Sequence, residues 1–251
     1  DYDDALPTLS AVDLADGARL QVVATTNLVA DVVAQIGGDH IDLTPLMPIG
    51  ADPHSFTSTP QDLITLNRAD VIFINGLELE ESLMPVLTSL DSAPPLVAVN
   101  VGVTTREFTG PEEGHEEGEE HHHGSTDPHT WFSVPAVEQW VTNIEAVLST
   151  LDPTNAAAYA TNAAAYRAEL AALETELNET VAELPVKERK LVTDHDAFGY
   201  FAAAYDFTIV GAVIPSLSTM ASPSANELAA LQDQIEAEGV RAIFVGTTVN
   251  P

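Results

Sequence analysis

The sequence contains no cysteine, and this absence excludes several kinds of chemistry at once. Without thiols the chain can form no disulfide, no thiolate zinc site and no cysteine nucleophile. Long apolar runs are missing as well, because none approaches the roughly 18–20 residues that a membrane span requires. We therefore expect a protein that does not span a membrane and whose metal sites, if it has any, use nitrogen and oxygen ligands.

Basic residues are scarce, since 8 Lys and Arg stand against 39 Asp and Glu and give a formal charge of −31. Nucleic-acid backbones and anionic membranes both bind basic surfaces, so this charge argues against either as a partner and favours cations. The first residues, Asp1-Tyr2-Asp3-Asp4, lack the basic and apolar regions of a signal peptide. The chain is then either cytoplasmic or a mature protein from which a signal has been removed.

The 251 residues are 45% hydrophobic, which is enough for one large α/β domain or for two connected lobes. Apolar runs and turn residues predict strands at residues 20–24, 41–46, 71–74, 96–99, 190–193, 208–213 and 241–245. Helical periodicity and capping signals predict helices at residues 28–36, 80–90, 133–148, 197–205 and 224–238, and one that starts at Pro60. Alternating strands and helices indicate βα units, so we expect mostly parallel sheets flanked by helices.

The most regular segment follows Asp152-Pro153, where apolar residues recur at steps of three and four from Tyr159 to Leu184. Some 30 helical residues would form a rod roughly 45 Å long, enough to cross one lobe and enter another. The chain then ends at Pro251, shortly after a predicted strand, so the second lobe is expected to be truncated. The predicted organisation is an acidic flexible leader at 1–18, a first lobe at 19–150, an inter-lobe helix at 151–185 and a partial second lobe at 186–251.

Two histidines share the local pattern Asp-Pro-His-x-aromatic, in Asp52–Phe56 and in Asp127–Trp131. A third, His195, lies between two aspartates directly after an apolar strand. Proline stiffens such a loop, and an aspartate can hold one ring N–H so that the other ring nitrogen is free for a metal. The plain alternative is three unrelated loop histidines. The pattern predicts a metal site with ligands His54, His129 and His195 and with supporting carboxylates Asp52, Asp127, Asp194 and Asp196.

A low-complexity acidic loop occupies residues 107–126, and its part at 111–123 contains six Glu and four His. It has nothing apolar to bury, so it is expected to be solvated. Imidazoles among carboxylates suit loose capture of a divalent cation, although such a loop could also be merely polar. The auxiliary ligands predicted on this basis are His115, His121, His122 and His123.

These motifs together resemble the zinc- or manganese-binding substrate-binding proteins of ABC importers. The resemblance rests on Met47–His54 with Pro60-Gln61-Asp62, on Asp127–Trp131 and on Asp194–Phe201, and it covers about residues 20–251 in the family's order. An acidic His-rich loop before the second motif is typical of the zinc branch. The resemblance implies two lobes joined by a rigid helix and one metal ion in the cleft between them.

What the resemblance implies for this chain is a metal-capture protein and not an enzyme. His54 and His129 would come from the first lobe and His195 from the second, with a fourth ligand, usually Asp, expected beyond Pro251. The protein is expected to act as a monomer in the periplasm or at the cell surface and to deliver its ion to a membrane permease of the ABC type.

The identity of the metal and two other functions stay open at this point. Three neutral imidazoles suit Zn²⁺ better than the harder Mn²⁺, so zinc is favoured with manganese as the alternative. A metal-dependent surface or adhesin protein is a second interpretation. A zinc hydrolase is a third, because three histidines and an open position also build catalytic zinc, but the sequence has no His-Glu-x-x-His motif.

Overall fold

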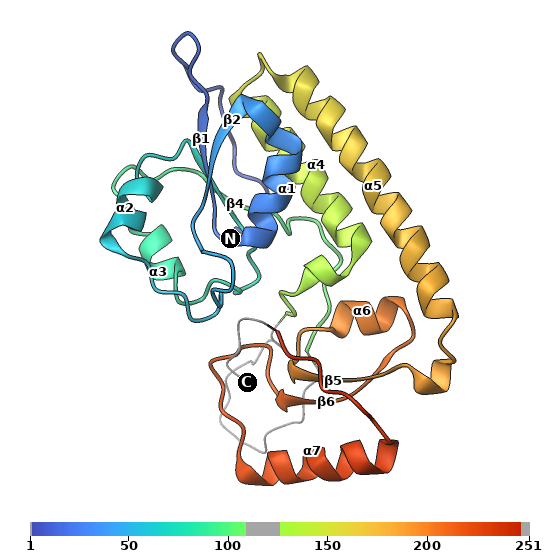
Figure 1. Ribbon diagram of the computed structural model, residues 1–251. Coiled ribbons are helices and arrows are strands. Elements are labelled where there is room, and N and C mark those ends of the chain that lie inside the picture. The colour runs from blue at the N-terminus through green and yellow to red at the C-terminus, as the bar shows by residue number, and fades with distance from the viewer. Residues whose placement is uncertain (1, 109–125, 247–251) are drawn as a thin grey trace.

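Strands and helices alternate along the chain in the computed structural model, which describes residues 2–108 and 126–246. They form two separate parallel sheets, each flanked by helices, and one long helix runs from the first unit to the second (Figure 1). The expected α/β class with two lobes is thereby confirmed.

The first sheet has four parallel strands in the order β2-β1-β3-β4. Their bounds are β1 Leu20–Ala24, β2 Ile41–Pro45, β3 Val71–Ile74 and β4 Leu96–Ala98. All four residues of β3 are buried, as a strand covered on both faces requires. Val71 and Phe73 belong to one hydrophobic cluster, and Ile72 and Ile74 belong to the other.

Helices cover both faces of this sheet. One cluster is closed by α1 Asn27–Gly37, α4 Val134–Leu151 and the first half of α5 Ala156–Ala182. The other is closed by the short helices α2 Pro60–Leu66 and α3 Met84–Leu87. Thr59 caps α2 in the predicted way, because its hydroxyl accepts from the Asp62 N–H and the Asp62 carboxylate accepts from the Thr59 N–H.

The long helix is α5, whose 27 residues span roughly 40 Å. Tyr159, Ala163 and Leu170 are its buried residues, and they pack against the first unit. Farther along, Glu174 Oε2 accepts a hydrogen bond of 3.0 Å from the Tyr205 hydroxyl of the second unit. Figure 1 shows α5 lying along the first unit and ending beside the second, so it joins the two.

The second sheet consists of the parallel strands β5 Lys190–His195 and β6 Thr208–Ile214. Helix α6 Gly199–Ala204 connects them, and α7 Ala225–Glu238 packs against β6. The predicted capping box at Ser224 and Glu227 starts α7. In both sheets the strands are parallel, so the loops that follow them gather at the carboxyl edges, where a ligand site is expected.

The predicted helix at 80–90 is wrong for most of its length, because only Met84–Leu87 is helical. Glu80, the predicted first residue of this helix, is buried, and its side chain turns back to the end of β3. Its carboxylate accepts from the N–H groups of Asn75 and Gly76 and from the Thr25 hydroxyl. Leu77 and Glu78 adopt positive φ angles in the tight turn between β3 and Glu80, just before the predicted start of the helix.

The predicted strand at 241–245 is also wrong. Only Phe244 reaches β5, where it forms a single parallel bridge with Thr193. Its N–H donates to the Val192 carbonyl and its carbonyl accepts from the Asp194 N–H. A strand requires consecutive paired residues, and one bridge does not provide them.

The leader at 1–18 does not fray over the residues that the structure describes. The Val12 N–H donates to the Leu151 carbonyl at 2.8 Å, which ties the segment to the end of α4. Four of its apolar side chains pack against the first hydrophobic cluster: Leu6, Leu9, Val12 and Leu14. Their spacing is irregular, so no helical or strand periodicity marked them as core residues.

Candidate metal centre

Three histidines from distant parts of the sequence meet at the carboxyl edges of the two sheets. His54 lies in the loop after β2, His129 directly precedes the 3₁₀ turn Thr130–Phe132, and His195 is the last residue of β5. One ring nitrogen from each lies within 4.8 Å of those of the other two. No other such group of His, Asp or Glu occurs among residues 2–108 and 126–246.

An aspartate fixes the backbone at each of the three positions. The N–H of His54 donates to Asp52 Oδ1 at 3.1 Å, and the N–H of His129 donates to Asp127 Oδ1 at 2.9 Å. At the third position the His195 N–H donates to the adjacent Asp194 at 2.8 Å. Such local bonds between an Asp side chain and the main chain stabilise turns and set where the histidine side chain begins.

Two of these aspartates also hold the imidazole ring itself. Asp127 Oδ1 lies 2.8 Å from Nδ1 of His129, and Asp194 Oδ1 lies 3.1 Å from Nδ1 of His195. A carboxylate beside Nδ1 keeps the proton there, which leaves Nε2 as a lone-pair donor. Asp194 is fixed in turn, because its second oxygen accepts from the Gly246 N–H at 2.8 Å.

The two Nε2 atoms of His129 and His195 face each other at 3.1 Å. With both protons on Nδ1, no hydrogen lies between these atoms, and their lone pairs would repel. A cation between them removes the repulsion. Two nitrogens bound to one tetrahedral Zn²⁺ lie roughly 3.3 Å apart, as follows from Zn–N distances of about 2.0–2.1 Å. The observed spacing matches that geometry.

The third imidazole, His54, is buried, and its Nε2 has no hydrogen-bond partner among the described residues. An unpaired buried nitrogen is costly unless it serves another purpose, and metal binding is such a purpose. Its backbone carbonyl accepts from the Ser82 hydroxyl at 2.6 Å, so the loop is fixed from two sides.

The surroundings of His54 and His195 favour their neutral forms. The pKa of His54 is lowered to about 4, mainly by burial and also by the neighbouring His129 and His195, against the opposing charge of Asp52. Burial and His129 also lower the pKa of His195, although Asp194 opposes the shift. Neutral imidazole is the form that binds metal, so these two rings need not lose a proton at pH 7.

The nitrogens open into a small cavity of about 110 Å³. Trp131 forms one wall, with its ring edge-to-face against His129 at a centroid distance of 5.1 Å. Met47 and Leu79 supply further apolar surface, and Thr219 enters from the second unit. The cavity is well below the roughly 300–1,000 Å³ of pockets that hold drug-sized ligands, so it suits a small ion better than such a molecule.

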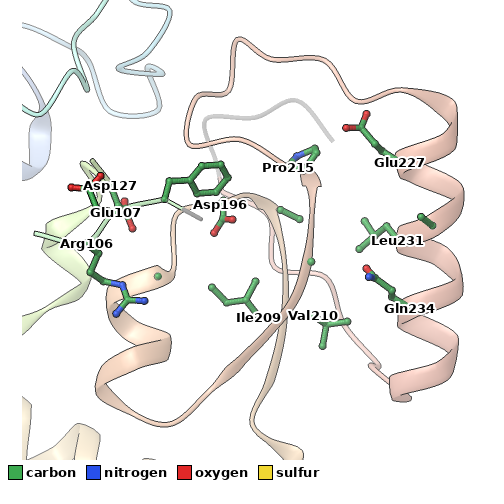
Figure 2. A pocket seen from close by; sticks show the side chains of 15 residues that line it. Arg106, Glu107, Asp127, Asp196, Ile209, Val210, Pro215, Glu227, Leu231 and Gln234 are labelled. Carbon is green, nitrogen blue, oxygen red and sulfur yellow. The ribbon is translucent and has the colours of Figure 1, made fainter. Parts of the chain in front are cut away.

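Neither Asp52 nor Asp196 is hydrogen-bonded to an imidazole among the described residues. Asp52 bonds the backbone of His54 and no bond joins it to an imidazole among the described contacts. Asp196 lies on the wall of a second, larger cavity of about 600 Å³. Figure 2 shows it there with Asp127, Arg106 and Glu107, across from residues of α7. Burial and the nearby Asp127 raise the pKa of Asp196.

Two asparagines that the sequence interpretation missed support the His129 loop. The Asn75 amide donates to the Pro128 carbonyl at 3.1 Å, and Asn100 Oδ1 accepts from the Thr130 hydroxyl at 2.6 Å. Both residues are buried and follow closely after apolar strands. A polar residue at the carboxyl end of a buried strand was the available signal. The predicted ligands His115, His121, His122 and His123 lie outside the described residues.

Comparisons with known proteins agree with this architecture. The family described as the periplasmic component A of the zinc-uptake complex, ZnuA, matches residues 22–251. The manganese-binding lipoprotein MntA of Bacillus subtilis is 34% identical over 232 residues, which are 92% of this chain and 72% of that protein. The zinc-binding protein TroA of Treponema pallidum is 33% identical over 238 residues, 94% of this chain and 72% of that protein.

Solved structures give the same result. The periplasmic zinc-binding protein TroA of Treponema pallidum superposes with a TM-score of 0.80 at 32% identity and covers 93% of this chain and 80% of its own. A crystal structure of ZnuA gives a TM-score of 0.78 at 27% identity and covers 93% of this chain and 84% of its own.

The fold and the histidine cluster define a substrate-binding protein of a metal ABC importer, not an enzyme. The chain belongs to the ZnuA family. Within the described residues, no helix combines the length and the apolar character needed to cross a membrane. Its relatives divide between proteins named for manganese and proteins named for zinc, so sequence likeness alone does not choose the metal.

Proposed function

We propose that this protein captures one Zn²⁺ ion between its two lobes through His54, His129 and His195 and delivers it to an ABC permease. The observation that carries the proposal is the arrangement of the Nε2 atoms. Those of His129 and His195 face each other at 3.1 Å, and the buried Nε2 of His54 has no hydrogen-bond partner in the part of the chain that the structure describes. One ring nitrogen from each of the three lies within 4.8 Å of those of the other two.

The donor set favours zinc over manganese. Three imidazole nitrogens are borderline ligands that suit Zn²⁺, whereas Mn²⁺ prefers carboxylate and carbonyl oxygens. The carboxylates that contact imidazole rings, Asp127 and Asp194, bond to His Nδ1 and backbone N–H groups and so support the imidazoles. Asp52 lines the cavity, and its oxygens accept from the His54 N–H and from the Ser55 and Thr219 hydroxyls. Manganese is the competing candidate because MntA of Bacillus subtilis, a relative at 34% identity, is named for it.

Competition titration against a chromophoric chelator at pH 7 tests the choice of metal. The protein should bind zinc at least about 100-fold more tightly than manganese, in line with imidazole ligation and the general order of divalent affinities. Alanine at His54, His129 or His195 should each remove the tight site. Equal or tighter binding of manganese would overturn the zinc assignment, and tight binding that survives all three substitutions would overturn the site.

Delivery to a permease places the protein outside the cytoplasmic membrane, in the periplasm or at the cell surface, where we propose that it acts as a monomer. The family membership and the relatives named as lipoproteins of ABC transporters support this location. In a strain that lacks the gene, the wild-type protein should restore growth under zinc limitation and the His129→Ala variant should not. Restoration of growth by both proteins would show that the protein's role does not depend on this metal site.

A further inference from the structure

Two hydroxyl groups of the second unit reach across to the histidine loops of the first. One belongs to Thr219, in the segment between β6 and α7. Its Oγ1 donates to Asp52 Oδ2 at 2.5 Å, while Asp52 Oδ1 accepts from the His54 N–H. Thr219 also lines the small cavity that the three imidazoles share. This one carboxylate therefore connects the His54 backbone to the second unit.

The other hydroxyl belongs to Tyr200, a buried residue of α6. It donates to the Asp127 carbonyl at 2.8 Å and accepts from the Arg106 N–H at 3.1 Å. The carboxylate of the same Asp127 holds both the backbone and the ring of His129. A second hydrogen bond thus connects the second unit to an aspartate that positions a ligand.

The hydrogen bonds of Thr219 and Tyr200 have a similar arrangement. In both Asp-Pro-His loops the aspartate fixes its own histidine and also accepts a hydroxyl from the second unit. The segments that supply the hydroxyls also border His195. Tyr200 follows it by five residues, and the Ser216 carbonyl, three residues before Thr219, accepts from the Asp196 N–H at 3.0 Å. Each contact therefore links the His195 side of the cleft to another ligand.

We infer that Thr219 and Tyr200 are positioning residues that hold the two lobes closed over the metal and so set the rate of its release. The inference rests on the proposed metal-binding function. When the lobes separate, both hydroxyl contacts must break, and the His54 and His129 loops lose a point of attachment at the moment His195 withdraws. Removing either hydroxyl should make opening easier without changing the ligands.

Isosteric substitutions isolate the hydroxyls. Thr219→Val replaces the hydroxyl by a methyl group, Thr219→Ser keeps a hydroxyl, and Tyr200→Phe removes only the phenolic oxygen. The matched control is Tyr205→Phe. Tyr205 is equally buried and also makes one hydroxyl bond across segments, to Glu174 on α5, but it lies away from the imidazoles.

The measurement is the rate at which bound Co²⁺ is lost from the full chain to an excess of chelator, together with the Co²⁺ absorption spectrum and the melting temperature of the metal-free protein. Thr219→Val and Tyr200→Phe should each release Co²⁺ about three- to tenfold faster, as the loss of one hydrogen bond implies. Their spectra should stay unchanged, and Thr219→Ser and Tyr205→Phe should release Co²⁺ at the wild-type rate.

Release at the wild-type rate from both Thr219→Val and Tyr200→Phe would overturn the inference and leave the metal site intact. Equal acceleration by Tyr205→Phe would also overturn it, because the effect would then reflect general loosening of the second lobe. A changed Co²⁺ spectrum in Thr219→Val would mean that Thr219 acts on the ligand set. Failure of the wild-type protein to bind Co²⁺ or Zn²⁺ at all would instead overturn the proposed function.

Discussion

At two of the three histidine positions an aspartate holds the imidazole ring as well as the backbone. Asp127 illustrates this most fully, since one of its oxygens serves both the N–H and the Nδ1 of His129. Residues that orient a metal ligand are often worth 10–100-fold in affinity, because the ligand otherwise adopts other rotamers or the wrong tautomer. The role of the supporting aspartate can therefore be tested by substitution in the same way as the role of the histidine.

The Asp127→Asn variant should bind zinc about 10- to 100-fold more weakly, since an amide holds the Nδ1 proton of His129 less well than a carboxylate does. Chelator competition at pH 7 measures the change. Asp152→Asn is the control, because Asp152 is equally buried and accepts from Tyr159 and Asn155 far from the imidazoles. Equal losses of affinity in the two variants would contradict a specific role for Asp127.

The lowered pKa of His54 predicts how the metal-free protein responds to acid. In the unfolded chain this imidazole binds a proton below its ordinary pKa of 6.5, whereas in the folded chain it stays neutral until about pH 4. The unfolded state thus binds more protons in this window, and the free energy of unfolding should fall as the pH falls from 6.5 to 4. The effect is on the order of 3 kcal/mol.

Urea unfolding of the metal-free protein at several pH values measures this dependence. His54→Gln removes the titrating group, so the variant should lose less stability than the wild type between pH 6.5 and pH 4. Carboxylates that titrate in the same range contribute equally to both proteins and cancel in the comparison. Parallel pH profiles of the two proteins would show that the buried His54 does not cause the loss of stability in acid.

The cluster of three histidines could be predicted from the sequence because each has a local pattern, Asp-Pro-His or Asp-His-Asp, that does not depend on the fold. Their supports could not all be predicted. The pattern gave the same role to Asp52, Asp127, Asp194 and Asp196, but which oxygen reaches which nitrogen depends on loop conformation. The contacts of Thr219 and Tyr200 depend on how the two lobes pack against each other, and no local sequence pattern predicts that packing.

At the scale of the elements, the strands could be predicted from the sequence more reliably than the turns that follow them. The bounds of β1 and β3 are those predicted, because buried apolar runs between turn residues are a strong signal. The helix expected at 80–90 is helical only at Met84–Leu87, and Glu80, its predicted first residue, is buried at the end of β3. Helical periodicity cannot show that a glutamate side chain caps a turn.

Glu80→Gln tests this account of the turn after β3. The carboxylate accepts from the N–H groups of Asn75 and Gly76, whereas an amide would present its own donors to one of them. We expect a loss of about 1–3 kcal/mol in the free energy of unfolding, measured in urea. Glu78→Gln, at an exposed position in the same turn, should change little. A loss no larger than that of Glu78→Gln would contradict the capping role.

At the scale of the whole molecule, the dominant feature is the charge of −31. Like charges repel in the folded state more than in the expanded chain, so a strongly charged protein is destabilised at low ionic strength. The same field raises the local concentration of cations, which suits the capture of a metal ion. Only 8 basic residues are present to offset the acidic ones.

Salt should therefore stabilise the metal-free protein. Raising the ionic strength from about 0.05 M to about 0.5 M shortens the screening length severalfold and should raise the melting temperature by several degrees. Sodium and potassium chloride should act alike, because screening depends on ionic strength. A melting temperature that is unchanged or lower in salt would show that self-repulsion is not a significant cost.

The central claim is that one zinc ion lies between the imidazoles of His54, His129 and His195. Anomalous diffraction at the zinc edge, from crystals grown with one equivalent of Zn²⁺, locates the ion directly. We predict a single strong peak with three imidazole nitrogens about 2.0–2.1 Å away. A peak at another place in the protein, or coordination there by carboxylate oxygens alone, would contradict it.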